Sequence, residues 1–232
     1  MKKSFCSLFV AAIVSLTVVC AHAAETASEA VVLKVKGSAQ ATLPGQSQAT
    51  TLKVGDKLPQ GTVIKTPGSS EVEIQAFSGS VTTIKPGSTV DLNKLSLTTD
   101  NGAVTKQTAV IDIKVGSVVA SLDPSKKAIN DYSIRTPKGV AAARGTVYTV
   151  YVALDGSVRV SVSSGSITFT SGITGQPVTV QPGYSVTITP DGAISEPTPT
   201  TSNEIPTTPT SPNNETIDPT IPNSEAVVSP SS

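Results

Sequence analysis

Short runs rich in valine, isoleucine and threonine, separated by glycine, proline, asparagine and aspartate, fill most of this chain. β-Branched residues suit the pleated, half-buried surface of a strand, whereas the separating residues favour turns. After the N-terminal segment, no stretch keeps an apolar stripe at helical spacing over several turns. The pattern therefore predicts an all-β fold, with strands near residues 31–36, 62–65, 71–76, 109–115, 146–153, 158–163, 167–170 and 185–189.

Several of these runs alternate between apolar and polar residues, which gives a strand one buried and one solvated face. Val158, Val160 and Val162 are expected to point into the core, while Arg159 and Ser161 point outward. The dipeptides Asn-Gly at 101–102 and Asp-Gly at 155–156 lie between runs. Both predict hairpins with type I′ turns, in which two successive residues have positive φ.

Two short motifs recur along the chain. Ile-Lys-Thr-Pro at 64–67 is followed by Ile-Arg-Thr-Pro at 134–137, and Pro-Gly-Ser at 86–88 by Pro-Gly-Tyr at 182–184. The two intervals differ, so a solenoid of equal rungs is excluded. A short-strand β-solenoid-like stack and a β-sandwich both remain possible architectures.

The N-terminus has the features of a secretory signal. Lys2 and Lys3 precede an apolar run at 8–20, and Ala21-His22-Ala23 fits the small-x-small cleavage pattern. We therefore expect residues 1–23 to be removed and the protein to be exported, to the periplasm or outside the cell. Lipid anchoring at Cys20 is the alternative, but Val19 stands where lipoprotein signals carry a small residue. No later segment is apolar enough to predict a transmembrane helix.

The C-terminus changes composition near residue 195. Residues 196–232 contain eight of the 17 prolines, five acidic residues, and no lysine, arginine or aromatic residue. Such a segment buries too little apolar area to offset the entropy lost on ordering. The sequence therefore predicts an all-β domain at 24–195 and a disordered, acidic Pro/Thr/Ser-rich tail at 196–232.

After residue 23 the chain contains no histidine, cysteine, tryptophan or methionine. Most catalysis near neutral pH uses an imidazole, a thiolate or a metal held by such groups. Carboxylates could still hydrolyse glycosides, but Glu71, Glu73 and Asp112 are expected on solvated strand faces. We therefore predict no catalytic residues, no metal site and no cofactor. The 15 basic and 12 acidic residues of the body form no basic stripe, which argues against nucleic acid.

An ordered set of motifs carries a family resemblance. A run ending in Thr136-Pro137 is followed by an Ala/Gly-rich link, by Arg144-Gly145-Thr146, and by a hairpin leading to Ser164-Gly165. Upstream, Gly-Asp at 55–56, Gly-Thr at 61–62 and Pro-Gly-Ser at 86–88 fit the same order. Across residues 31–188 the chain resembles the FecR family domain, named for the periplasmic part of a membrane regulator of iron-citrate uptake.

The resemblance implies a non-catalytic body that binds another protein. Sigma-regulator members place an anti-sigma segment and a transmembrane helix before this domain, whereas here an export signal takes that place. We therefore expect a stand-alone exported version that does not itself hold a sigma factor. The motif residues carried over, all in structural roles, are Thr136, Pro137, Gly139, Arg144, Gly145, Thr146, Gly165 and Gly183.

Three of these positions also have a direct physical interpretation. Pro137 biases Thr136 to extended geometry and lacks an N–H group, so it should end a strand. Gly145 suits a bulge or a close backbone approach. Arg144 follows three alanines, and we hypothesise that its guanidinium pins this link to the body through backbone carbonyls; binding a ligand is the alternative role.

The sequence favours a protein-binding or signal-relay module of the bacterial cell envelope. Exposed sheet edges could accept an extra strand from a partner. Tyr132, Tyr148, Tyr151 and Tyr184 are either core residues or, where they face outward, anchors for a partner. The alternative function is a structural or surface-matrix component with the tail as a stalk. The sequence identifies neither the protein partner nor the oligomeric state.

Overall fold

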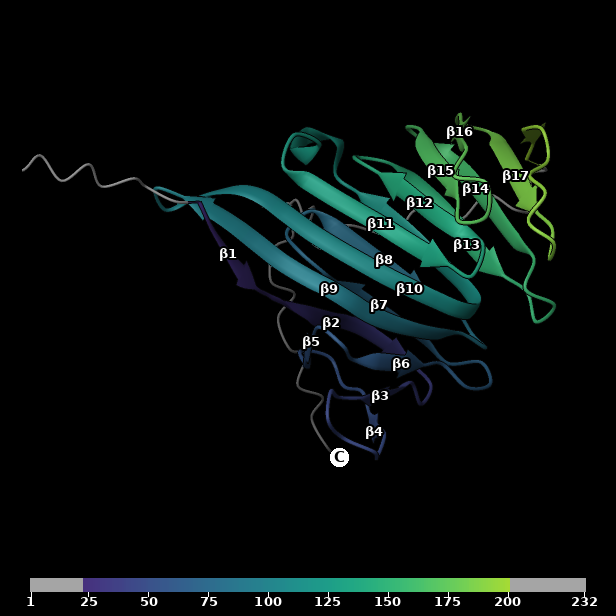
Figure 1. Ribbon diagram of the computed structural model, residues 1–232. Helices are drawn as coiled ribbons and strands as arrows, with labels where there is room; N and C mark the ends of the chain where they lie inside the picture. Colours follow the sequence, from purple (N-terminus) through teal and green to yellow (C-terminus); the bar gives the residue numbers. More distant parts are fainter. Residues whose placement is uncertain (1–22, 201–232) are drawn as a thin grey trace, which may run out of the picture.

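The computed structural model describes residues 23–200, and in this part the chain is almost entirely β-structure. The predicted signal residues 1–22, including Cys20 and His22, and residues 201–232 lie outside the described residues. Two stacked sheets, A and B, make up the body (Figure 1). The helical content of the described part is one 3₁₀ turn, η1 (Pro124–Lys126). The predicted all-β class is confirmed.

Sheet A contains the strands that cross the front of Figure 1. From one edge to the other they pair in the order β16 (Pro177–Val180), β15 (Ile167–Ser171), β12 (Gly139–Ala143), β11 (Asn130–Thr136), the first part of β10 (Ala103–Leu122), β9 (Thr89–Asp100), β6 (Val63–Lys65), β3 (Gln40–Thr42) and β4 (Thr50–Thr51). Residues 96–99 of β9 also pair with β1 (Ala24–Ala27). All pairs are antiparallel except β10 with β11.

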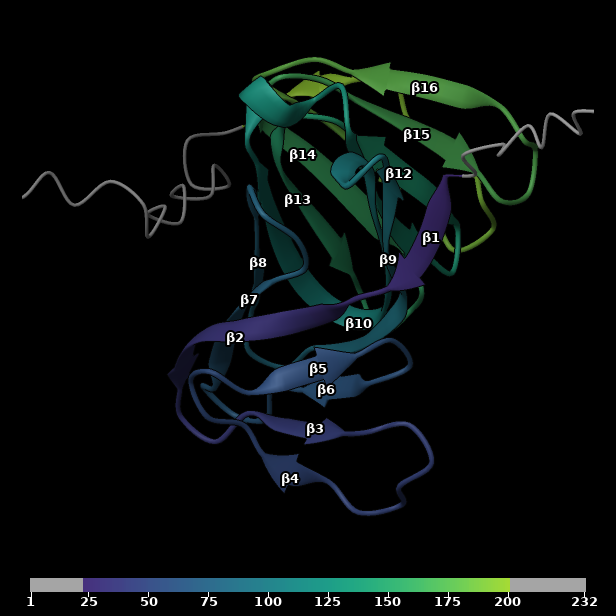
Figure 2. The ribbon, with the colours of Figure 1, turned by 90° about the vertical axis from the view of Figure 1, so that its left-hand side faces the viewer.

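Sheet B lies behind sheet A, and Figure 2 shows β8 and β13 on one side of the molecule with β9 and β1 on the other. Its pairing order is β18 (Thr198–Pro199), β17 (Tyr184–Ile188), β14 (Val158–Ser164), β13 (Val147–Val152), the second part of β10, β8 (Ser80–Ile84), β7 (Glu71–Gln75), β2 (Glu29–Lys36) and β5 (Lys57–Pro59). Both sheets are open, because their outermost strands each have one partner.

Strand β10 belongs to both sheets. Its residues up to Val115 pair with β9, and its residues from Gly116 onward pair with β13 and β8. Gly116 has a φ of 98°, and a Cβ there would lie 2.5 Å from the Ser88 Cα. Only glycine fits this bend at such a close backbone approach. The bend lets one strand pass from one layer to the other.

Beyond β10 the chain alternates between the layers in hairpins: β11–β12 in sheet A, β13–β14 in sheet B, β15–β16 in sheet A and β17–β18 in sheet B. Each hairpin buries its apolar face against the opposite layer. Of the two architectures that the sequence left open, the β-sandwich describes this arrangement.

The core between the sheets contains the alternating apolar residues of both layers. Val158, Val160 and Val162 are buried, as predicted from their spacing. The largest buried side chains include Tyr132 from sheet A and Tyr148 from sheet B. The Tyr132 hydroxyl lies 2.7 Å from Thr82 Oγ1, a hydrogen bond that joins the two sheets.

Both predicted hairpins form, but with different turns. Asn101 and Gly102 have φ angles of 49° and 79°, so both adopt the left-handed region that a type I′ turn requires. In the β13–β14 turn Gly156 has positive φ and Asp155 does not. There the Gly156 N–H donates to the Ala153 carbonyl at 3.0 Å, and the Asp155 carboxylate accepts from the Ser157 N–H at 2.9 Å. The type I′ prediction is therefore wrong for this hairpin.

The first residues of the predicted tail belong to the sandwich. Thr198 and Pro199 form β18, and the Thr200 N–H donates to the Gly183 carbonyl at 2.7 Å. The body therefore extends to the end of the described residues.

Candidate functional site

Three motif residues build the β11–β12 turn. The Thr136 hydroxyl donates to the Gly139 carbonyl at 3.0 Å and accepts from the N–H groups of Lys138 and Gly139 at 3.2 and 3.1 Å. Strand β11 ends at Thr136, directly before Pro137. A Cβ at Gly139 would lie 2.2 Å from the Thr170 carbonyl oxygen of β15. These residues close a tight turn and let β12 approach its neighbour.

Gly145 and Thr146, which follow the C-terminal end of β12, pack against two other turns. A Cβ at Gly145 would lie 2.6 Å from the Pro124 Cα, and one at Gly165 would lie 2.9 Å from Thr146 Oγ1. Thr146 is buried, and its hydroxyl donates to the Ser166 carbonyl at 3.1 Å. The segment after β12, the 3₁₀ turn and the β14–β15 turn are therefore held together by two glycines and one threonine.

Arg144 lies on the outside of this joint. Its side chain is exposed, and within residues 23–200 it makes no hydrogen bond or ion pair. The hypothesis that its guanidinium pins the link therefore finds no support, because Gly145 and Thr146 hold the segment instead. The alternative role that the sequence left open for Arg144, binding a ligand, is compatible with this exposure.

Arg144 lines a shallow hollow of about 320 Å³ on the outer face of sheet A. The hollow also touches Asp131, whose carboxylate lies 2.6 Å from Lys106 Nζ. Two cationic groups and one carboxylate give this region a net positive charge, which suits a carboxylate on a bound molecule. Small side chains form the remaining lining: Ala142, Ala143, Ser166 and Thr168, together with Tyr132 at the base.

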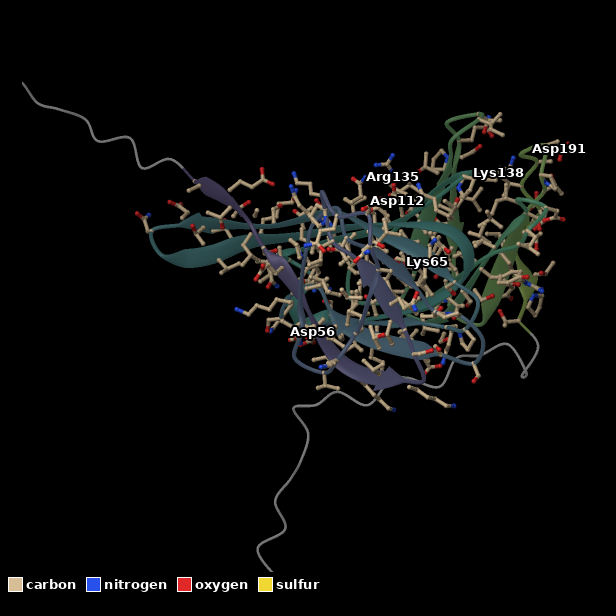
Figure 3. The ribbon with its side chains drawn as sticks, turned by 90° about the horizontal axis from the view of Figure 1, so that it is seen from below. Asp56, Lys65, Asp112, Arg135, Lys138 and Asp191 are labelled. Carbon is tan, nitrogen blue, oxygen red and sulfur yellow. The ribbon has the colours of Figure 1, made fainter. Side chains whose placement is uncertain are left out.

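A charged cluster lies near the C-terminal end of β11, whereas the hollow lies near its start. Asp91 and Asp112 face each other across the β9–β10 pairing. The Asp112 carboxylate lies 3.4 Å from Arg135 Nε and 3.7 Å from Lys114 Nζ, and Figure 3 shows Arg135 beside it. These cations cover Asp112, which is only 9% exposed although it points outward; the expected solvated position is therefore wrong.

Burial, with the Asp112 charge as a smaller cause, raises the pKa of Asp91. Asp112 is therefore ion-paired on the sheet surface, whereas Asp91 makes no salt bridge within residues 23–200 and its Oδ1 is buried without a hydrogen-bond partner. Glu71 and Glu73 are half-buried on the outer face of sheet B, where they pair with Lys85 at 2.9 Å and Lys34 at 3.8 Å. No group of three or more potential metal ligands occurs within residues 23–200.

The tyrosines fall into two pairs. Tyr132 and Tyr148 are buried, and burial raises the pKa of both hydroxyls. Tyr151, on the outer face of sheet B, and Tyr184 are 48% and 41% exposed. Gly183, the last motif residue, has a φ of 79° and donates its N–H to the Val162 carbonyl at 2.8 Å.

One known family matches the central part of the body. The model of the family described as "FecR protein" matches residues 62–168. The chain contains a FecR domain. The matched residues run from β6 into β15 and include the Arg144 joint, so the FecR domain supplies the central strands of both sheets. Strands β1–β5 and β16–β18 lie outside the match and extend the two layers.

Solved structures similar to this chain include two crystal structures of a "putative anti-sigma factor" from Parabacteroides distasonis ATCC 8503, at 1.65 and 2.50 Å resolution. Each superposes with a TM-score of 0.47 at 13% identity, and each covers 59% of this chain. The chain spans 59% of the length of that protein. No curated protein matches the sequence. Within residues 23–200 no helix is long and apolar enough to span a membrane.

Proposed function

We propose that this protein is an exported, non-catalytic FecR-type module of the bacterial cell envelope that binds another protein to relay a signal. The FecR domain supports a signalling role, since the family is regulatory. The N-terminal signal pattern supports export. The body from residue 24 onward contains no histidine or cysteine, which supports a role in contact rather than in catalysis.

The observation that carries the proposal is the exposed Arg144. It is part of the family motif, yet the neighbouring Gly145 and Thr146 fulfil the structural need of the segment. An arginine at the centre of a contact often supplies much of its binding energy, because its guanidinium makes bidentate bonds to a carboxylate. Arg144 is therefore the proposed anchor for an acidic side chain of the partner.

The surroundings of Arg144 suit a protein surface. The outer face of sheet A beside it consists of small exposed residues such as Ala142, Thr168 and Thr170. A flat face of this kind lets a partner approach without displacing large side chains. Close contacts around a central arginine then exclude water from its bonds. Lys106 and Arg135 at its margins are paired with Asp131 and Asp112, so Arg144 supplies the positive charge on this face that would attract an acidic partner.

The test is capture of the partner in the native cell envelope with tagged, full-length protein and a chemical crosslinker. Arg144→Ala should remove a discrete crosslinked species that the unaltered protein yields, and Arg144→Lys should weaken it, because lysine cannot form the bidentate contact. Lys53→Ala is the matched control: Lys53 is also exposed but lies in the β4–β5 connection.

The melting temperature of each variant is measured alongside the capture. An Arg144→Ala protein that melts normally and loses the species supports the proposal. Retention of the species at full yield, or equal loss in Lys53→Ala, contradicts it. A protein that crosslinks only to itself or to cell-wall material would instead indicate a structural role.

A further inference from the structure

Both sheets of the sandwich end in strands that have one partner within residues 23–200. The edge strands are β16 and β4 in sheet A, and β18 and β5 in sheet B. We call residues 172–180 and 188–199 the C edge, and residues 50–59 the N edge. Figure 2 shows β16 at the top of the molecule and β4 at the bottom. The two edges therefore cannot meet within one chain.

Each edge contains a groove between the two sheets. A groove of about 270 Å³ at the C edge has Val178 and Ile194 in its lining. One of about 230 Å³ at the N edge is lined by Leu43, Leu52 and Leu58, among others. Val178, Ile194 and Leu43 pack against the core but are only partly buried. The apolar core is thus incompletely covered where the sheets end.

An exposed aliphatic side chain lies at each edge. Ile173, in the β15–β16 loop, is 58% exposed, and Val54, in the β4–β5 connection, is 66% exposed. Ile173 contacts Gly192 of the groove lining, because a Cβ there would lie 2.1 Å from its Cδ1. Val54 follows two residues after Leu52 of the other groove. Exposed apolar groups that adjoin apolar grooves mark surfaces for contact with another molecule.

The two aliphatic residues lie at the same end of the strands. Ile173 follows Ser171, the last residue of β15, which pairs beside the β11–β12 turn. Val54 follows Thr51, the last residue of β4, which pairs through β3 and β6 with the first residue of β9. That turn and the start of β9 lie where β10 bends at Gly116. Two copies placed edge to edge, with their sheets aligned, therefore bring Ile173 of one copy beside Val54 of the other.

The strand directions of sheet A fit the same contact. Eight pairings lead from β16 to β4, and all except β10–β11 are antiparallel. Seven reversals leave β16 and β4 running in opposite directions, so β16 of one copy and β4 of the next can form an antiparallel pair. The pair is short, because Pro177 lacks an N–H group and β4 has two residues. Most of the contact must therefore come from side chains.

The two edges carry opposite charge. The C edge contains Asp191 and Glu196 and no lysine or arginine, whereas the N edge contains two lysines and one aspartate. Glu196 and Lys57 line the two grooves, both are exposed, and neither makes a salt bridge within residues 23–200. Opposite charges favour contact of a C edge with an N edge and oppose contact between two C edges.

We propose that copies of this chain bind head to tail, with the C edge of one copy against the N edge of the next. Ile173 and Val54 then cover the grooves, and Glu196 and Lys57 supply complementary charge. The contact joins two different surfaces, so it is heterologous and can repeat from copy to copy. The outer face of sheet A stays open in this assembly, which does not depend on the partner proposed for Arg144.

The test follows the oligomeric state of the full-length protein by sedimentation velocity over a range of concentrations. The unaltered protein should form larger species as its concentration rises. Ile173→Asp disables the C edge and Val54→Asp disables the N edge, so each variant alone should stay monomeric. An equal mixture of the two should form dimers and nothing larger, because one intact C edge and one intact N edge remain.

Val104→Asp is the matched control. Val104 is also an exposed aliphatic residue, at 42%, but it lies in the β9–β10 hairpin away from both edges. This variant should assemble like the unaltered protein. The melting temperatures of all three variants are measured alongside, and they should change little because the altered side chains are exposed.

A charge exchange tests the contact without altering an apolar residue. Glu196→Lys should weaken the assembly, and Lys57→Glu in the same chain should restore it, because the two edges are then again opposite in charge. This pair of variants decides the question if an aspartate variant melts early.

Four results overturn the proposal: an unaltered protein that stays monomeric at every concentration, assembly of Ile173→Asp alone, a mixture that stays monomeric, and a charge exchange that does not restore assembly. Loss of assembly in Ile173→Asp but not in Val54→Asp shows that two C edges meet, which also contradicts a head-to-tail contact.

Discussion

At the scale of single residues, the FecR motif separates into residues that hold the fold and one that does not. Gly145, Gly165 and Thr146 occupy positions where added or lost atoms disturb neighbouring segments. Arg144 does not occupy such a position. The sequence identifies all four as a motif, but it cannot distinguish these roles, because Pro124 and Ser166 come close to Gly145 and Thr146 only in the folded chain.

The first prediction concerns Gly145. Gly145 and Gly45 have nearly the same φ, 75° and 76°, so alanine at either position costs similar backbone strain. A Cβ at Gly145 meets the Pro124 Cα at 2.6 Å, whereas one at Gly45 has nothing within 4 Å. Gly145→Ala should therefore lower the free energy of unfolding by about 1–3 kcal/mol more than Gly45→Ala. Equal losses in urea titrations would show that the close approach is unimportant.

The second prediction compares two buried tyrosines. Tyr132→Phe removes the hydrogen bond to Thr82 and leaves that buried hydroxyl unsatisfied, which should cost about 1–2 kcal/mol. The Tyr148 hydroxyl is buried without a partner, so Tyr148→Phe should leave the free energy of unfolding unchanged or raise it. Thermal unfolding of the two variants checks this order, and a greater loss in Tyr148→Phe would refute it.

At the scale of elements, alternation predicts the strands well and their lengths poorly. The predicted runs 71–76 and 158–163 nearly coincide with β7 and β14. The run 109–115 is only the middle of β10, which continues through Gly116 to Leu122. Glycine usually marks a turn, but here it bends a strand between sheets, because Ser88 packs against it. That contact is not visible in the sequence.

The third prediction belongs to the β9–β10 pairing. Directly opposed like charges destabilise a sheet, by about 0.2–1 kcal/mol, so Asp91→Asn should stabilise the protein by that amount at pH 7. The folded-state pKa of Asp91 is raised above its ordinary value of 3.8, so the folded chain binds the proton more tightly. Stability therefore falls as the pH rises from 3.8 through the folded-state pKa.

The gain in the free energy of unfolding of Asp91→Asn should thus be present at neutral pH. It should disappear in acid below 3.8, the ordinary pKa of an aspartate. Urea titrations at a series of pH values measure it. Asp100→Asn, near the hairpin tip on the same strand, is the control and should change little. A gain for Asp91→Asn that is independent of pH would show that the opposed charges are not its cause.

At the scale of the whole molecule, the two outer faces of the sandwich differ in exposure. Sheet A carries the exposed Arg144 beside small exposed residues, whereas outward residues of sheet B such as Val119 and Thr83 are buried. The sequence predicts the all-β class and the FecR motif. It does not predict the two faces, because their accessibility depends on which strands pair and where the chain leaves the sandwich. Thr198 and Pro199, assigned to the tail by composition, pair with β17 for the same reason.

The fourth prediction tests this division of faces. A photo-crosslinking amino acid is placed in the full-length protein at Ala142, on the outer face of sheet A, or at Ser121, on the outer face of sheet B, and irradiated in the native envelope. We expect Ala142, beside Arg144, to capture a second protein and Ser121 to capture none, as identified by mass spectrometry. Capture of a second protein from Ser121, with none from Ala142, would contradict the account.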